Sequence, residues 1–156
     1  MSYVVTGLSA EPFRHLFSQS EAALAEAGVI RMTADKKPGF PCRVSLKDAE
    51  PGETLLLLNH EYLDADTPYR GRHAIFVREA DIPAARFKDE IPEQLRVRLL
   101  SVRAFDVAGM MRDAEVVEGT ELESLITDRF FADPQVSFLQ VHNARRGCYA
   151  AQIERA

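Results

Sequence analysis

The chain carries the stretch VSFLQVHNARRGCYAAQIE at residues 136–154. Apolar and polar residues alternate on both sides of the tip Ala144-Arg145-Arg146-Gly147, with a period of about two. Such alternation predicts strands at 136–143 and 148–154, joined as a β-hairpin. Because a hairpin pairs its strands antiparallel, this stretch points to an antiparallel sheet.

Two registers are open to this hairpin, and they place Cys148 differently. A loop of two or four residues pairs His142 with Tyr149 and puts Cys148 on the opposite face. A three-residue loop, with Gly147 in the left-handed conformation as a bulge, pairs Ala144 with Cys148. We predict the second register, because it separates an apolar face (Leu139, Val141, Tyr149, Ala151, Ile153) from a less apolar one (Gln140, His142, Cys148, Ala150, Gln152). His142 is then the diagonal neighbour of Cys148, roughly 7 Å away.

The residues upstream predict further strands and two main helices. Capping boxes begin the helices at Ser18 and Thr120, and the helices end at Gly28 and Asp133-Pro134. Strands are expected at 3–8, 29–32, 43–46, 54–59, 74–78, 113–117 and, with a first turn that could be helical, 95–105. Short turns between these elements predict one α+β domain over residues 1–156, with a largely antiparallel sheet and a C-terminal β-hairpin.

Composition excludes several classes of protein. The 156 residues are 46% hydrophobic and 28% charged, which is ordinary globular usage. A net charge of −5 makes nucleic acid a poor default partner, although a local patch could bind a small anion. No apolar run approaches the roughly 20 residues that span a bilayer, and the first residues lack the features of a signal peptide. We therefore expect a cytoplasmic protein with no membrane partner.

The two cysteines, Cys42 and Cys148, have no CxxC spacing and are expected to be free thiols. A zinc site from these cysteines with His73 and His142 has suitable ligand types but lacks a closely spaced pair, so no metal is predicted. No P-loop, GxGxxG, GxSxG or HExxH motif is present, and no cofactor is predicted. His60 is expected at the surface.

The hairpin carries the candidate site. An imidazole and arginine side chains near Cys148 would favour its thiolate form, and Arg145 and Arg146 could hold a carboxylate or phosphate. Asn143 could hydrogen-bond a ligand. The structural alternative makes Cys148 a small buried apolar residue, His142 a packing residue and the two arginines solvated turn residues.

A weaker candidate lies in residues 60–72, which are expected to form a long loop. Tyr69, Arg70 and His73 could line a pocket there, although the polarity of a loop alone explains these residues.

The strings PGFPCR (38–43) and HNA with GCY (142–144 and 147–149), together with Pro68-Tyr69 and Ile75-Phe76-Val77, resemble a domain-of-unknown-function family numbered 1203. The similarity covers nearly the whole chain. It implies a bacterial single-domain protein and no established activity. Because both specific strings contain a cysteine beside an arginine or a histidine, the resemblance adds Cys42 and Arg43 to the candidate residues.

Two functions follow, and the sequence leaves open whether the protein is an enzyme. In the first, the protein binds or transforms a small anionic molecule, with Cys148 or Cys42 as nucleophile, His142 as base and Arg43, Arg145 or Arg146 holding the anion. In the second, it is a non-catalytic binding module, a homodimer through a sheet edge or the hairpin tip. The acidic net charge and the 8% of aromatic residues disfavour a nucleic-acid binder that would use Arg96, Arg98, Arg103, Arg145 and Arg146.

Overall fold

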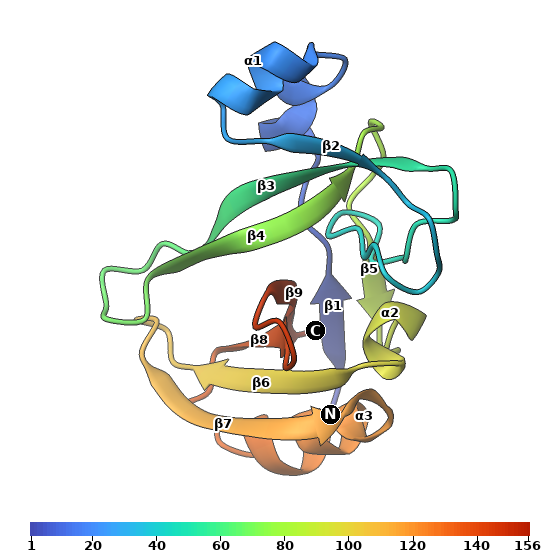
Figure 1. The fold of residues 1–156 in the computed structure, drawn as a ribbon. Coiled ribbons are helices and arrows are strands. Elements are labelled where there is room, and N and C mark those ends of the chain that lie inside the picture. Colours follow the sequence, from blue (N-terminus) through green and yellow to red (C-terminus); the bar gives the residue numbers. More distant parts are fainter.

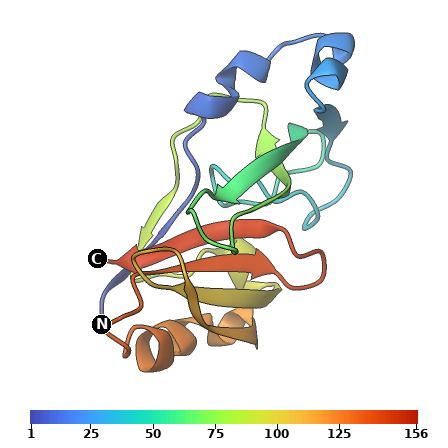
Figure 2. The same ribbon diagram turned by 90° about the vertical axis from the view of Figure 1, so that its left-hand side faces the viewer.

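Two antiparallel sheets and a helical layer are stacked on one another in the computed structural model, which describes residues 1–156 (Figures 1 and 2). The helical segment of residues 119–130 covers one face of the larger sheet, and the smaller sheet covers the other face. This arrangement confirms the predicted α+β class. None of the helices has the length and apolar character needed to span a bilayer.

The larger sheet has the strand order β5-β1-β9-β8-β6-β7, and every neighbouring pair is antiparallel. Its strands are β1 (Tyr3–Thr6), β5 (Arg86–Lys88), β6 (Leu99–Phe105), β7 (Met111–Glu118), β8 (Phe138–Asn143) and β9 (Tyr149–Arg155). The sequence predicted all of these except β5, which is too short to show a period. The hairpin of β8 and β9 lies in the middle of the sheet and therefore fixes its order.

The smaller sheet has the order β2-β3-β4, again antiparallel. Its strands are β2 (Ile30–Thr33), β3 (Thr54–Leu63) and β4 (Gly71–Arg78). The prediction of a long loop at 60–72 was wrong, because β3 and β4 continue through most of it and only residues 64–70 connect them. Polar residues pair across these two strands, and His60 lies opposite His73.

The predicted strand at 43–46 was also wrong. These residues form turns, with isolated bridges from Pro41 to Asp48 and from Cys42 to Phe76. Val44 and Leu46 are nevertheless fully buried. The apolar pattern therefore reported burial of a loop and not an extended conformation.

The helices are short: η1 (Glu11–Leu16), α1 (Glu21–Glu26), α2 (Glu93–Arg96), η2 (Gly119–Glu121), α3 (Leu122–Ser124) and η3 (Leu125–Phe130). Gly28 follows α1 with a φ of 73°, as its predicted role requires. The predicted caps are wrong. Ser20, not Ser18, caps α1 by accepting a hydrogen bond from the Ala23 amide, and no side chain of Thr120 caps the second helical segment.

The hairpin uses both registers that the sequence allows. Leu139 faces Ile153 and Val141 faces Ala151, as in the predicted register. A bulge then shifts the pairing, so that His142 faces Tyr149, and the Asn143 amide donates to the Cys148 carbonyl across a four-residue loop. The left-handed Gly147 is confirmed, with φ 76°, but the bulge lies in β9 and not at this glycine.

The bulge corrects the predicted faces of the hairpin at three positions. Tyr149, predicted on the apolar face, lies on the same side as His142 and joins the core beneath the smaller sheet. Ala150, predicted beside His142, packs in the core beneath the helical segment. Cys148 lies opposite Asn143, whereas the predicted register placed it opposite Ala144.

Candidate functional site

Arg43 is held in a loop that is fixed by its own backbone. Its amide donates to the Phe76 carbonyl at 3.0 Å, and its carbonyl accepts from the Leu8 amide at 2.8 Å. A Cβ atom on Gly7 would lie 2.1 Å from the Val44 carbonyl oxygen, so only glycine allows the loop to approach this closely. The loop therefore delivers the Arg43 side chain to a defined place beside the hairpin.

The Arg43 guanidinium is buried without a carboxylate partner. The residue is 1% exposed. Its Nε donates to the Tyr149 carbonyl at 2.8 Å, its Nη1 to the Pro41 carbonyl at 2.6 Å and its Nη2 to the Cys148 sulfur at 3.0 Å. Burial lowers the pKa of Arg43, and the charge of Cys148 opposes this shift. A guanidinium stays protonated in proteins, so a positive charge is enclosed here.

Cys148 receives two donors and is 8% exposed. Besides Arg43, the Asn143 Nδ2 donates to its sulfur at 3.4 Å. Two side-chain donors therefore converge on this sulfur. Asn143 is 9% exposed, and its buried Oδ1 has no hydrogen-bond partner. An acceptor without a donor therefore lies beside the sulfur.

His142 is fully buried and has its own partners. Its Nδ1 lies 3.2 Å from the Gly147 carbonyl oxygen, and its Nε2 lies 3.3 Å from Gln140 Oε1 and 3.4 Å from Arg103 Nη1. Burial, followed by the charge of Arg103, lowers the pKa of His142 to about 4. The imidazole is therefore neutral near pH 7. No hydrogen bond joins it to Cys148, and both ring nitrogens are occupied by other groups.

Aromatic and imidazole rings surround His142 between the two sheets. The Tyr62 ring centroid lies 4.8 Å from that of His142, and the Tyr149 centroid lies 5.8 Å away. His60 was expected at the surface and is half-buried: its ring packs 5.9 Å from that of Tyr149, and burial lowers its pKa. His73, a predicted site residue, lies opposite His60 on β4. The sequence missed Tyr62 and His60 because both lie in the segment that was assigned to a loop.

Cys42 is separated from this chemistry by its own contacts. It is fully buried, and its sulfur accepts only backbone N–H groups, from Val44 and Arg78, each at 3.4 Å. Its carbonyl accepts from the Gln94 side chain at 3.1 Å. These contacts are those of a packed core residue. No group of three or more His, Cys, Asp or Glu side chains is placed to hold a metal ion.

Tyr69, another predicted site residue, lies away from the sulfur. Its ring packs edge-on against Phe105, with centroids 6.1 Å apart. Arg145 and Arg146 are exposed at the hairpin tip, where neither pairs with a carboxylate or makes a side-chain hydrogen bond. The structure thus brings together Cys148, Asn143 and Arg43 directly and leaves Tyr69 outside the cluster.

The arginines without carboxylate partners gather near the hairpin. Most arginines in this acidic chain form ion pairs, as Arg31 does with Glu79 and Arg98 with Asp48. Those with no carboxylate within ion-pair distance are Arg43, Arg86, Arg103, Arg145, Arg146 and Arg155. Four of them lie in the hairpin turn or contact the hairpin: Arg43, Arg103, Arg145 and Arg146. Arg43 is the one of these whose side chain contacts the Cys148 sulfur.

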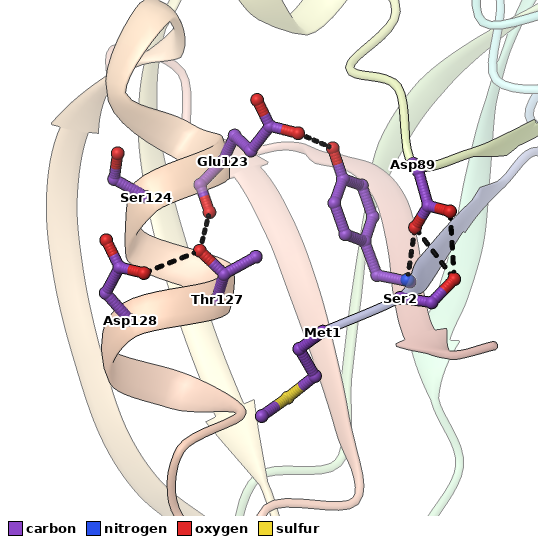
Figure 3. A pocket seen from close by; sticks show the side chains of 8 residues that line it. Met1, Ser2, Asp89, Glu123, Ser124, Thr127 and Asp128 are labelled. Carbon is purple, nitrogen blue, oxygen red and sulfur yellow. Dashed lines mark hydrogen bonds between the residues drawn. The ribbon is translucent and has the colours of Figure 1, made fainter.

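Two surface depressions of the molecule lie away from Cys148. One, of about 640 Å³, is lined by acidic and hydroxyl side chains, and its Glu123 and Asp89 accept hydrogen bonds from Tyr3 and Ser2 (Figure 3). Another, of about 620 Å³, lies beside Arg112 and Arg155. Neither is lined by any residue of the Cys148 cluster. The 8% exposure of Cys148 favours a small ligand there.

One family model matches the chain over residues 39–155, and its description is a protein of unknown function, DUF1203. The match includes Arg43, Asn143 and Cys148, and it confirms the resemblance that the sequence strings indicated. No curated protein and no solved structure matches the chain.

Proposed function

Because the chain belongs to the DUF1203 family of proteins of unknown function, we propose its function from the site itself: it binds and transforms a small anionic molecule through Cys148. The observation that carries this proposal is the buried Arg43 guanidinium, whose only partner able to carry negative charge is the Cys148 sulfur. A buried charge without a counter-charge is costly. The thiolate of Cys148 offsets that cost and is also the nucleophilic form of cysteine.

Each neighbour of Cys148 has a distinct part in this proposal. Arg43 holds the thiolate and, being 1% exposed, can reach only a group that lies directly at the sulfur. Asn143 gives the sulfur a second donor. Neutral His142 holds the turn through the Gly147 carbonyl, which differs from the role of base that the sequence predicted. It is a positioning residue for the loop that carries Cys148.

The exposed arginines at the tip supply the preference for an anion. Arg145 and Arg146 flank the approach to Cys148 along the chain, and Arg103 lies beside His142. A unit charge about 8 Å from a ligand charge in water contributes about 0.5 kcal/mol, which is about twofold in rate or affinity for each arginine. The preference is therefore modest for each residue and larger for the group.

Alkylation by two reagents of similar size but different charge tests this proposal. Iodoacetate is anionic and iodoacetamide is neutral, and peptide mass spectrometry assigns the modified cysteine. We expect modification at Cys148 before Cys42. We also expect the iodoacetate-to-iodoacetamide rate ratio to fall about twofold in each of Arg145→Gln and Arg146→Gln. Arg86→Gln is the matched control, since Arg86 is also exposed and unpaired but lies on β5.

Three results bear on the proposal separately. If Cys148 is modified at the same rate as Cys42 or more slowly, the assignment of Cys148 as nucleophile is rejected. An unchanged rate ratio in both tip variants would remove the anion preference. Ultraviolet absorbance of the thiolate near neutral pH, present in the wild type and lost in Cys148→Ser, reports the ionised sulfur without requiring a reagent to enter.

A homodimeric binding module is the competing proposal. Strand β7 pairs only with β6, so its outer edge is free, and Val116 is 56% exposed on it. Asp113 and Glu115 lie on the same strand and bind Arg129, and charged side chains on an edge strand oppose pairing with a second chain. A dimeric mass in solution that becomes monomeric in Val116→Lys would support this alternative, and a monomeric wild type would end it.

A further inference from the structure

The acceptor that lies unused beside Cys148 restricts what the thiolate can attack. Asn143 Nδ2 donates to the sulfur, while Oδ1 of the same amide is buried and has no donor. Buried polar atoms are nearly always hydrogen-bonded, so a missing partner points to a group that arrives with a ligand. That group must donate a hydrogen bond within a few ångströms of the atom that the sulfur attacks.

The burial of the sulfur restricts the electrophile further. Cys148 is 8% exposed, so little space is open around its sulfur. A trigonal carbon must bring three substituents to the sulfur, and an alkyl halide carries no hydrogen-bond donor at the atom attacked. The terminal oxygen of a hydroperoxide brings only one hydrogen and one further oxygen. It is therefore both slim enough to reach the sulfur and able to donate to Asn143 Oδ1.

Building on the proposed function, we propose that Cys148 reacts with a small hydroperoxide, R–OOH, whose R group carries the negative charge and whose terminal O–H donates to Asn143 Oδ1. The thiolate attacks the terminal oxygen, an S–O bond forms and the O–O bond breaks. The products are the sulfenic acid Cys148–S–OH and the alkoxide RO⁻, which takes a proton from water to give ROH. The sulfur is oxidised by two electrons, and the peroxide is reduced by the same two electrons.

Arg43 serves both halves of this step. Its guanidinium has five N–H groups, and the three contacts to Tyr149, Pro41 and Cys148 leave others unused. The contact between Nη2 and the sulfur places the guanidinium beside the O–O bond that breaks. Positive charge there stabilises the negative charge that develops on the leaving oxygen.

The reaction with hydrogen peroxide tests this inference, with dimedone trapping the sulfenic acid and peptide mass spectrometry assigning the site. In the wild type we expect sulfenic acid at Cys148 and not at Cys42, formed faster than on free glutathione at the same pH. This measurement needs no variant. If Cys148 is oxidised no faster than glutathione, the inference is overturned.

A second reagent isolates the part of Asn143 Oδ1. Methyl methanethiosulfonate reacts with the same thiolate but carries no O–H or N–H donor. In Asn143→Leu we expect the peroxide rate to fall about fivefold more than the methanethiosulfonate rate, which is the size of one lost hydrogen bond. An equal fall in both rates means that Asn143 acts only on the sulfur, and this overturns the assigned contact.

The two reagents also separate the inference from the proposal beneath it. Fast reaction of Cys148 with methyl methanethiosulfonate and slow reaction with peroxide would leave the nucleophile intact and reject the hydroperoxide. Slow reaction of folded wild-type protein with both reagents would reject the nucleophile and the hydroperoxide together.

Discussion

A double-mutant cycle at Arg43 and Cys148 measures the interaction on which the proposed function depends. The variants are Arg43→Met, Cys148→Ala and the two combined. In the folded protein the guanidinium lies 3.0 Å from the sulfur, with both residues buried. If the sulfur is a thiolate, the pair is an ion pair. Each single variant then leaves one buried charge without its partner, and the double variant removes both charges.

The structure gives the expected size of each effect. Cys148→Ala leaves a buried guanidinium without its counter-charge, which typically costs about 3–5 kcal/mol. Arg43→Met leaves two main-chain carbonyls, those of Tyr149 and Pro41, without donors, at about 1–3 kcal/mol each. If the sulfur is instead a neutral thiol, its deletion costs only about 1–2 kcal/mol of lost packing. We therefore expect a coupling energy of about 3 kcal/mol for the ion pair and below about 1 kcal/mol for the neutral contact.

Urea denaturation followed by circular dichroism resolves this difference. With a slope of about 1–3 kcal/mol per molar urea, a coupling of about 3 kcal/mol corresponds to a midpoint shift of about 1–3 M. Cys42→Ala is the matched control for deleting a buried sulfur, because the Cys42 sulfur accepts only two backbone N–H groups. A double variant whose loss of stability equals the sum of the single losses would refute the ion pair.

Two further predictions concern stability. The free energy of unfolding is expected to fall by about 3 kcal/mol between pH 6.5 and 4 through His142, because its pKa is about 4 when folded and 6.5 when unfolded, so the unfolded chain binds the proton first. Acid titration of the wild type and of His142→Gln isolates this dependence as the difference between the two curves, because carboxyl groups with lowered pKa contribute equally to both. Ser20→Ala should cost about 1 kcal/mol, because Ser20 caps α1. Ser18→Ala should not lower stability, because Ser18 caps no helix and its φ of 63° is equally unfavourable for serine and alanine. Thermal melts of both variants compare them.

The sheet was predictable because its information is local. Alternation along β8 and β9 identified the hairpin, and the turn glycine identified the left-handed residue, Gly147. The bulge in β9 was not predictable in the same way. It reconciles a four-residue loop at the tip with the pairing of Leu139 and Ile153 in the core, and only the assembled sheet contains both constraints.

The candidate site was predictable only in part, because its central contact joins distant residues. Arg43 and Cys148 are 105 positions apart, and no periodicity relates them. The family strings placed both on one list of residues, but the distance between them comes from the loop that packs against Phe76 and Leu8. Cys42 lies in the same string as Arg43, and nothing in the sequence separated a core residue from a site residue there; Cys42 is a core residue.

The choice of arginine at position 43 argues that the thiol is more than packing. A neutral side chain would be enough to bind the Tyr149 and Pro41 carbonyls. A buried cation that served stability alone would be expected to pair with a carboxylate. The sulfur is the one hydrogen-bond partner of Arg43 that can carry negative charge, so under the proposed function folding and the ionisation of Cys148 favour one another. Any reaction that removes the negative charge from the sulfur then weakens the contact between the hairpin and the loop of residues 41–46. The chemistry of Cys148 is in this way coupled to the packing of the two sheets.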